Sequence, residues 1–229
     1  KVGGNRFRCL SKYGHGLLNV EEALQYSCNV FFFETAKVLG GSLLKKWADK
    51  LGLGNTTNID LAYEKKGNMP ESKSISQTVN LSIGQGAMLV TPIQITKMIA
   101  MIANDGWYIR PHILQRITDY NGNIILNNKH KPAERIGISE KNLDIIKRSL
   151  RRVVTDGTAK RTGLREMRVA GKTGTTQTAH DDINHAWFVG YAPFKNPKYC
   201  FTVVIEHTKG HGAEVAGPIV KNLLTQLGL

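Results

Sequence analysis

A polar run within a segment that otherwise resembles a strand is the feature that most constrains this chain. Lys172-Thr173-Gly174-Thr175-Thr176 directly follows the apolar residues Val169-Ala170-Gly171. Successive side chains alternate between the two faces of a strand, so Thr173 and Thr175 are expected on one face. Composition predicts three strands in this part of the chain, at Val169 to Thr175, Ala186 to Ala192 and Cys200 to His207.

Most of the other predicted elements are helices. Asn19 is a predicted N-cap, with Glu22 at the capping-box position, for a helix that ends near Ser27. Thr91-Pro92-Ile93-Gln94 is a strong helix start, with a Thr cap and Pro at the first position. The remaining predicted helices are Val30 to Leu39, one capped by Ser42 that ends at Gly52, one capped by Ser139, and 218–229.

The segments between these helices are predicted to be loops and one hairpin. Residues 53–90 are expected to be rich in loops, with a tight loop at 80–86. A hairpin is expected from Ile113 to Leu126, with a type I′ turn at Asn121-Gly122. No internal repeat or linker divides the sequence, so we expect one domain over 1–229. Its predicted parts are a mostly helical lobe at 19–105, followed by hairpin, helix, strands and closing helix at 106–229.

Charge and hydropathy exclude several classes of partner. The net charge is +13, but its basic pairs lie in separate segments without interleaved aromatic residues. We therefore expect a solvated basic surface and no nucleic-acid partner. No apolar run approaches the ~18 residues of a membrane span. Any membrane anchor is expected in sequence outside these residues.

The cysteines and histidines do not predict a metal site. Three cysteines, Cys9, Cys28 and Cys200, are too few and too widely spaced in sequence for a disulfide framework or a zinc site. His207 and His211 are spaced as His-X-X-X-His but lie in a polar turn, and no such motif occurs on a predicted helix. Cys28 has no evident histidine partner and is expected to be a buried packing residue. We expect no metal and no cofactor.

The polar groups suit serine acyl transfer, which needs a nucleophile, a base, oxyanion donors and groups that orient the acyl donor. Lys172 supplies positive charge for a substrate carboxylate, which the hydroxyls of Thr173 and Thr175 can also bind. The Thr175 backbone N–H is a candidate oxyanion donor. In the segment Ser27-Cys28-Asn29, Ser27 can relay a proton to the leaving nitrogen and Asn29 can bind an amide of the acyl side chain.

Together these motifs resemble the transpeptidase domain of class B penicillin-binding proteins, most closely the elongation-specific enzymes. The resemblance rests on the following segments: Tyr13-Gly14-His15-Gly16, Ser27-Cys28-Asn29, 54–64, Ile83-Gly84-Gln85-Gly86, Thr91-Pro92-Ile93-Gln94, Asn104-Asp105-Gly106 and Gly171 to Thr175. It implies an α/β fold of the β-lactamase/transpeptidase type, a mainly antiparallel sheet flanked by helices with an all-helical lobe. It also implies catalytic Ser27, Asn29 and Lys172, with substrate binding by Thr173, Gly174, Thr175 and Thr176.

The resemblance implies a D,D-transpeptidase that cross-links peptidoglycan stem peptides through a serine acyl-enzyme. β-Lactam antibiotics would trap that intermediate. Expected partners are stem peptides, β-lactams and membrane proteins of the elongation complex, on the periplasmic face of the bacterial inner membrane. Elongation enzymes often carry Asp at the position of Asn29.

The nucleophile of the family, a Ser-X-X-Lys motif, has one match here, Ser42-Leu43-Leu44-Lys45. We reject it because it follows Ser27-Cys28-Asn29, which reverses the family order, and because Ser42 is a predicted helix cap. The true nucleophile and the N-terminal strands are expected upstream, so these residues alone should be inactive. The strand Cys200–Thr208 would then expose an unpaired edge, which the fragment is expected to hide by association with itself, by strand swapping or by local disorder.

Two other functions use the same scaffold. A class A β-lactamase adds a glutamate that activates the deacylating water. Glu64 lies between the two motifs. Its neighbours Ile59-Asp60-Leu61 and Gly67 resemble those in penicillin-binding proteins, so we interpret Glu64 as structural. The other alternative is a non-catalytic relative that acts as a β-lactam sensor or a cell-wall scaffold.

Overall fold

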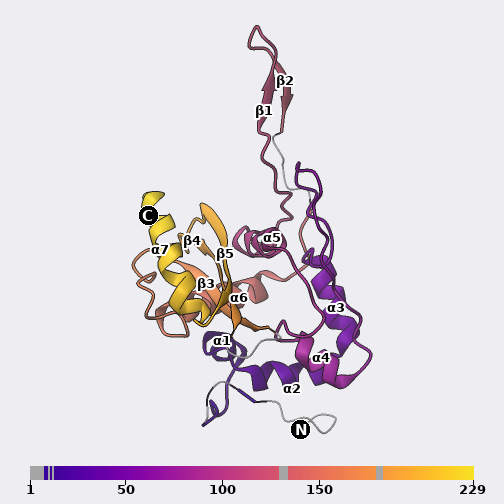
Figure 1. The fold of residues 1–229 in the computed structure, drawn as a ribbon, viewed down its shortest axis with the longest axis vertical. Coiled ribbons are helices and arrows are strands. Elements are labelled where there is room, and N and C mark those ends of the chain that lie inside the picture. Colours follow the sequence, from indigo (N-terminus) through magenta and orange to yellow (C-terminus); the bar gives the residue numbers. More distant parts are fainter. Residues whose placement is uncertain (1–7, 10, 12, 129–133, 179–182) are drawn as a thin grey trace.

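A computed structural model describes residues 8–9, 11, 13–128, 134–178 and 183–229. Figure 1 shows a small sheet with helices against it, a group of helices beside it, and a thin hairpin that extends away from both. In chain order the helices are α1 (Val20–Gln25), α2 (Asn29–Leu39), α3 (Gly41–Lys50), α4 (Ile75–Leu81), α5 (Pro92–Ala103), α6 (Glu140–Thr155), the short π-helix η1 (Gly212–Ala216) and α7 (Gly217–Gln226). The strands are β1 (Arg116–Thr118), β2 (Ile124–Asn127), β3 (Ala170–Gln177), β4 (Asn184–Ala192) and β5 (Tyr199–Thr208).

Three predicted helix starts are confirmed by their caps. Asn19 accepts a hydrogen bond from the Glu22 N–H, and the Glu22 side chain closes the capping box. Thr91 and Gln94 form the same box at the start of α5, with Pro at its first turn. The Ser139 side chain caps α6. These boxes satisfy backbone N–H groups that a helix leaves without partners, so sequence locates them well.

The second part of the chain, 106–229, contains a three-stranded antiparallel sheet with the order β3-β4-β5. Lys172 pairs with Val189 and Thr175 with Ala186 across β3 and β4. Strand β5 pairs with β4 through Phe201 opposite Gly190 and Tyr199 opposite Ala192. In the part of the chain that the structure describes, β3 and β5 are the two edges of this sheet.

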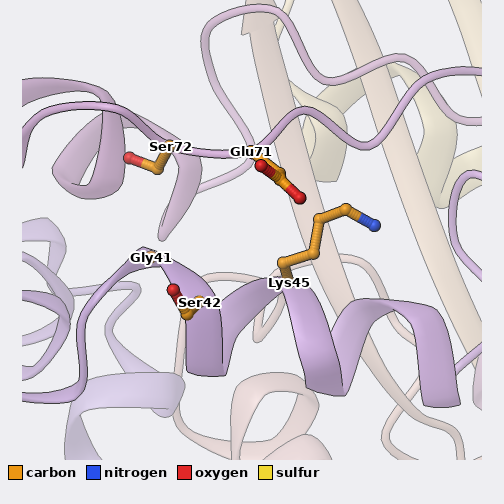
Figure 2. A pocket seen from close by; sticks show the side chains of 5 residues that line it. All are labelled: Gly41, Ser42, Lys45, Glu71 and Ser72. Atoms are coloured by element: carbon orange, nitrogen blue, oxygen red, sulfur yellow. The ribbon is translucent and has the colours of Figure 1, made fainter.

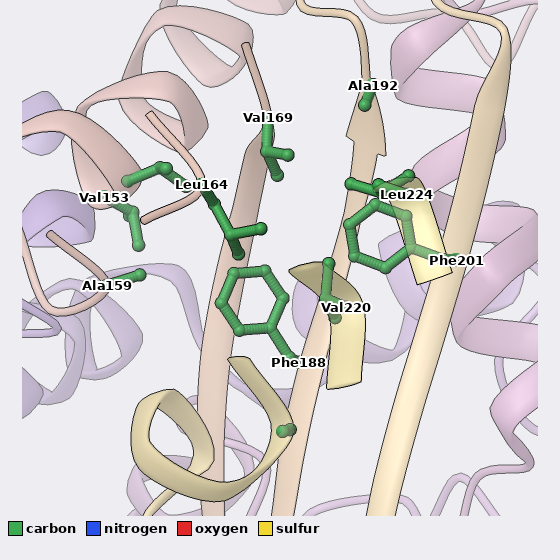
Figure 3. Close-up of a cluster of buried hydrophobic side chains, with 11 residues drawn as sticks. Val153, Ala159, Leu164, Val169, Phe188, Ala192, Phe201, Val220 and Leu224 are labelled. Atoms are coloured by element: carbon green, nitrogen blue, oxygen red, sulfur yellow. The ribbon is translucent and has the colours of Figure 1, made fainter. Parts of the chain in front are cut away.

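Helices cover both faces of the sheet. On one face η1 and α7 pack over a core whose fully buried members include Phe188 of β4, Val220 of α7 and Val153 of α6 (Figure 3). On the other face α5 and α6 pack against Ala170 and Tyr191. Helix α5 falls within the predicted helical lobe at 19–105, but in the structure it packs on the sheet. The predicted α/β architecture of antiparallel sheet and flanking helices is confirmed.

The hairpin is present, but its turn differs from the prediction. A type I′ turn needs a positive φ at both central residues, and of Asn121 and Gly122 only Gly122 has one, at 85°. The turn is instead closed by a 3.1 Å hydrogen bond from the Gly122 N–H to the Asp119 carbonyl. The Asp119 carboxylate also accepts from the N–H groups of Asn121 and Asn123. An aspartate that holds its own turn therefore overrides the Asn-Gly preference.

The predicted cap at Ser42 is wrong. Helix α3 begins at Gly41, and its N-cap is Gly40, which is also the C-cap of α2. A side chain at Gly41 would lie 2.5 Å from the Ser72 Cβ, so glycine allows this helix start to pack closely on the 70s segment. Ser42 therefore lies one residue inside the helix.

The region 53–90 is more ordered than the predicted loops. It contains α4, whose N-cap Ser74 accepts a 3.2 Å hydrogen bond from the Gln77 N–H. The predicted tight loop at 80–86 begins within the end of this helix, where the Asn80 carbonyl accepts from the N–H groups of Ile83 and Gln85. Across the described residues, no helix combines the length and apolarity that crossing a bilayer requires.

Candidate active site

Ser27 lies at a sharp corner between α1 and α2. Its φ is 53°, in the left-handed region that non-glycine residues rarely adopt. The corner is held by hydrogen bonds from the Cys28 N–H to the Ala23 carbonyl at 2.9 Å and from the Ser27 N–H to Leu24 at 3.2 Å. Helix α2 then starts at Asn29. The chain thus reverses over a few residues and places Ser27 and Asn29 together at one helix start.

Strand β3 carries the second group of candidate residues and lies very close to β4. A Cβ on Gly171 would lie 2.5 Å from the Val189 carbonyl oxygen and 3.0 Å from Phe188 Cε1. Only glycine allows this approach, because real Cβ atoms do not come within 3 Å of such neighbours. A Cβ on Gly174 would meet Trp187 Cβ at a less severe 3.3 Å. Gly171 therefore allows β3, the strand that carries Lys172, to lie close to β4.

The structure brings the two predicted segments together. The Lys172 amine donates a 2.9 Å hydrogen bond to Ser27 Oγ, from a position 145 residues away in sequence. It donates a second, 2.8 Å bond to the carbonyl of Thr173. Both bonds are within normal donor–acceptor distances. The amine therefore bridges its own strand and the corner that starts α2.

Burial changes the chemistry of this lysine. It lowers the Lys172 pKa from 10.5 to about 8, because a charged amine is poorly solvated there. At neutral pH the amine is still mostly protonated, so Ser27 Oγ receives a hydrogen bond from a cation. A hydroxyl in that position can accept a proton from the lysine and pass its own proton onward.

The threonine hydroxyls have partners that the sequence analysis missed. Thr173 Oγ1 lies 2.9 Å from Thr158 Oγ1, in the turn after α6. Thr175 Oγ1 accepts a 3.3 Å hydrogen bond from the Gly212 N–H, at the start of η1. No motif signals Thr158. A Cβ on Gly212 would lie 2.5 Å from the Gly174 carbonyl oxygen, which accounts for that glycine.

Thr176 lies farther along β3, directly opposite His185 of β4. The side chain of Asn29 is half-buried at the first position of α2. His185 Nδ1 accepts a 3.3 Å hydrogen bond from the backbone N–H of His207, and the two rings meet edge to face. The two imidazoles thus lie against each other on the neighbouring strands β4 and β5.

The alternative nucleophile Ser42 lies in a different place. It lines a small pocket with Gly41, Lys45, Glu71 and Ser72 (Figure 2). Lys45 extends away from Ser42 and donates to both carboxylate oxygens of Asp49 at 2.8 Å. The Lys45 amine is therefore engaged by Asp49 and directed away from Ser42. The rejection of Ser42 is supported by this ion pair, although the cap argument was wrong.

Glu64 is held by its own loop. One carboxylate oxygen accepts from the N–H and hydroxyl of Thr57, at 2.7 and 2.6 Å, and the other accepts from the Asn58 N–H at 3.0 Å. Burial would raise the Glu64 pKa, but these hydrogen bonds outweigh it and the pKa is lowered. These hydrogen bonds tie Glu64 to the 57–58 segment, in line with the structural role expected for it.

The fold gathers three soft ligands beside Ser27. The Sγ atoms of Cys9 and Cys28 and a ring nitrogen of His15 all lie within 4.8 Å of one another. Cys9 Sγ is 3.3 Å from His15 Nδ1, and the His15 ring stacks on Tyr26. Cys9 and Cys28 are therefore close in space although they are far apart in the sequence. Cys28 also has a histidine neighbour, His15, contrary to the prediction that it has none. Thiolates and imidazole are ligands of Zn²⁺, whose structural sites use four, and this cluster offers three.

The family model for the penicillin binding protein transpeptidase domain matches residues 5–225. The chain belongs to this family. Its resemblance to the PBP2-type members is also confirmed.

Curated relatives give the scale of the match. The chain is 30% identical to the peptidoglycan D,D-transpeptidase MrdA of Escherichia coli over 97% of its length, which covers 38% of that relative. It is 33% identical to the stage V sporulation protein D of Bacillus subtilis over 98% of its length, or 36% of that relative. The chain thus spans less than two-fifths of these relatives.

Solved structures agree. Pseudomonas aeruginosa PBP2, in complex with WCK 5153, has a TM-score of 0.84 at 31% identity, with coverage of 98% of this chain and 52% of that one. Helicobacter pylori PBP2, solved in complex with MreC, has a TM-score of 0.84 at 28% identity, covering 100% and 44%. The β-lactamase/transpeptidase-like fold is therefore established for this chain.

Proposed function

We propose that the protein to which these residues belong is a peptidoglycan D,D-transpeptidase. The observation that carries the proposal is the 2.9 Å hydrogen bond between Lys172 and Ser27, which joins two distant motifs at one site. Membership of the transpeptidase family and the likeness to MrdA proteins add to it. In such a protein the substrates are two stem peptides, an acyl donor that ends in D-Ala-D-Ala and an acceptor amine.

In the proposed reaction a serine hydroxyl attacks the D-Ala-D-Ala carbonyl. An ester forms and the C–N bond breaks. The leaving nitrogen takes the Ser27 proton, Lys172 replaces that proton, and the proton that the attacking serine lost to its base restores the charge of Lys172. The acceptor amine then attacks the ester and restores the serine. Thr173 and Thr175 bind the terminal carboxylate together with the Lys172 charge, and Asn29 binds the acyl side chain. Gly174 and Thr176 complete the strand along which the donor lies.

We further propose that the nucleophile lies outside these 229 residues. The lysine of the only Ser-X-X-Lys, at Ser42, is paired with Asp49. In the family the serine and its lysine base precede the Ser-X-Asn motif. From the likeness to elongation-specific enzymes we also propose that the whole protein acts at the periplasmic face of the inner membrane, with its anchor elsewhere in the sequence. A partner like MreC, seen with the H. pylori protein, is the kind of elongation-complex protein that we expect it to bind.

The test uses the whole protein, a D-Ala-D-Ala donor, an acceptor amine and a fluorescent penicillin. We expect release of one D-alanine for each cross-link, and a penicillin adduct that persists. Rapid turnover of penicillin would instead identify a hydrolase. A stable adduct without D-alanine release would identify a β-lactam sensor or a scaffold.

A further inference from the structure

The turn that follows α6 contacts both sides of the candidate active site, which are the wall formed by α1 and Ser27 and the wall formed by β3 and Lys172. On the side of α1, Gly157 fits so closely that a Cβ would lie 2.3 Å from the Gln25 carbonyl oxygen. The next residue, Thr158, donates its backbone N–H to that same carbonyl at 3.3 Å. Gln25 is 1% exposed and lies two residues before Ser27. The turn is therefore anchored to the helix that positions Ser27.

The side chain of Thr158 faces the opposite wall. Its hydroxyl lies 2.9 Å from the hydroxyl of Thr173, on β3 next to Lys172. Thr158 is exposed and Thr173 is half-buried, so this pair borders solvent at the site. One residue thus connects the Ser27 wall through its backbone and the Lys172 strand through its side chain.

Proton counting gives this pair a direction when an anion binds. Each hydroxyl has a single proton to donate and can also accept, and only one of the two protons lies between Thr158 and Thr173. A carboxylate is an acceptor only. Thr173 can donate to a carboxylate and remain hydrogen-bonded to Thr158 only if Thr158 supplies the proton between them. Thr158 therefore favours the orientation in which the Thr173 proton points at the ligand.

We propose that Thr158 is a positioning residue for recognition of the acyl donor's carboxylate. It orients the Thr173 hydroxyl as a donor and ties it, through Gln25, to the corner that holds Ser27. This inference rests on the proposed function, because the carboxylate is that of the D-Ala-D-Ala donor or of a β-lactam. It adds a residue that belongs to none of the sequence motifs.

Stability is expected to depend little on this hydroxyl. The turn is held by its backbone, including a 2.9 Å hydrogen bond from the Ala159 N–H to the Val153 carbonyl, and Ala159 is fully buried. The Thr158 side chain is exposed, so its removal leaves no buried group without a partner. Thr158→Val keeps the shape and removes only the hydroxyl. An effect on activity without an effect on folding can therefore be observed.

The experiment measures second-order acylation rates of the whole protein by benzylpenicillin and by its methyl ester, which lacks the carboxylate charge. We expect Thr158→Val to slow the reaction with benzylpenicillin about tenfold, the effect of one hydrogen bond to a charged group. The reaction with the ester should be unchanged, and Thr158→Ser should restore the rate. Thr155→Val is the matched control, because its hydroxyl contacts Arg151 and Asp156 outside the site.

A second measurement makes the result independent of how fast the ester reacts. In a Thr173→Val background, Thr158→Val should have no further effect on the reaction with benzylpenicillin, because the group that it orients is gone. Equal losses with both compounds, or independent losses in the double variant, would overturn the proposal. A wild-type protein that no penicillin acylates would overturn the proposed function and this inference together. Normal wild-type acylation with an unaffected Thr158→Val would overturn the inference alone.

Discussion

Lys172 Nζ donates a 2.9 Å hydrogen bond to Ser27 Oγ, although 145 positions separate the two residues in the sequence. The contact depends on a strand that Gly171 holds close to β4 and on a corner at which Ser27 adopts a positive φ. Neither segment could form it alone. The hydrogen bond between Lys172 and Ser27 therefore depends on the whole fold, and it joins the two groups that the proposed reaction uses for proton transfer.

The buried Lys172 amine predicts an unusual dependence of stability on pH. Its pKa is about 8 in the folded protein, against an ordinary value of 10.5. Between these values the unfolded chain binds more protons, so stability rises with pH over that window. The cost of burying the charge is complete below pH 8 and is lost by about pH 10.5.

Urea unfolding of wild type and Lys172→Met from pH 7 to 10.5 measures this effect. The free energy of unfolding of the wild type, relative to the variant, should rise by about 1–3 kcal/mol over that range. The difference between the two proteins removes the contribution of other groups that titrate at high pH. Parallel curves would show that the amine is solvated in the folded state.

Gly171→Ala should destabilise the protein more than Gly174→Ala. The first substitution places a Cβ 2.5 Å from a backbone oxygen of β4, and the second places one 3.3 Å from a side-chain carbon. We expect a loss of about 1–3 kcal/mol for Gly171→Ala from overpacking, and less than half of that for Gly174→Ala. Urea midpoints at pH 7 measure both. Equal losses would argue against the close approach of β3 to β4.

Residues 1–229 alone should not be labelled by a fluorescent penicillin. Ser42 is the only serine in a Ser-X-X-Lys motif, and its lysine is paired with Asp49. Mass spectrometry after incubation with the drug is expected to show the unmodified mass. A stoichiometric adduct that disappears in Ser42→Ala would restore Ser42 as the nucleophile.

The same residues are expected to associate through strand β5. Within the described part of the chain, β5 pairs with β4 on one side only, so its outer edge offers free N–H and C=O groups. Light scattering over a range of concentrations should show a mass that rises above the 25.4 kDa monomer. A monodisperse monomer in which hydrogen exchange shows all three strands protected would contradict this.

Local signals predicted the parts of the fold that have local causes. The capping boxes at Asn19 and Thr91 were found because the cap, the box residue and the apolar stripe lie within one turn of each other. The strands around Lys172 were placed to within about two residues for a similar reason. The contact between Lys172 and Ser27 could be expected only from the family resemblance, since no local rule connects residues so far apart.

The errors have tertiary causes. Gly41 packs on Ser72, which moves the start of α3 ahead of Ser42. The Asp119 side chain sets the hairpin turn in place of the Asn-Gly pair. Thr158 and the Cys9–His15–Cys28 cluster depend on segments that meet only in the folded chain. No spacing rule on the sequence can find such contacts.

A double-mutant cycle on Ser27 and Lys172 tests the central claim most directly. The measurement is the second-order rate of acylation of the whole protein by benzylpenicillin, for Ser27→Ala, Lys172→Met and the double variant. Each single change is expected to lower the rate by about 10²- to 10⁴-fold, because Ser27 and Lys172 belong to the same proton-transfer path and either change interrupts it. The account predicts that the double variant is no slower than the slower single variant. Losses that multiply would show that the two residues act independently and would contradict it.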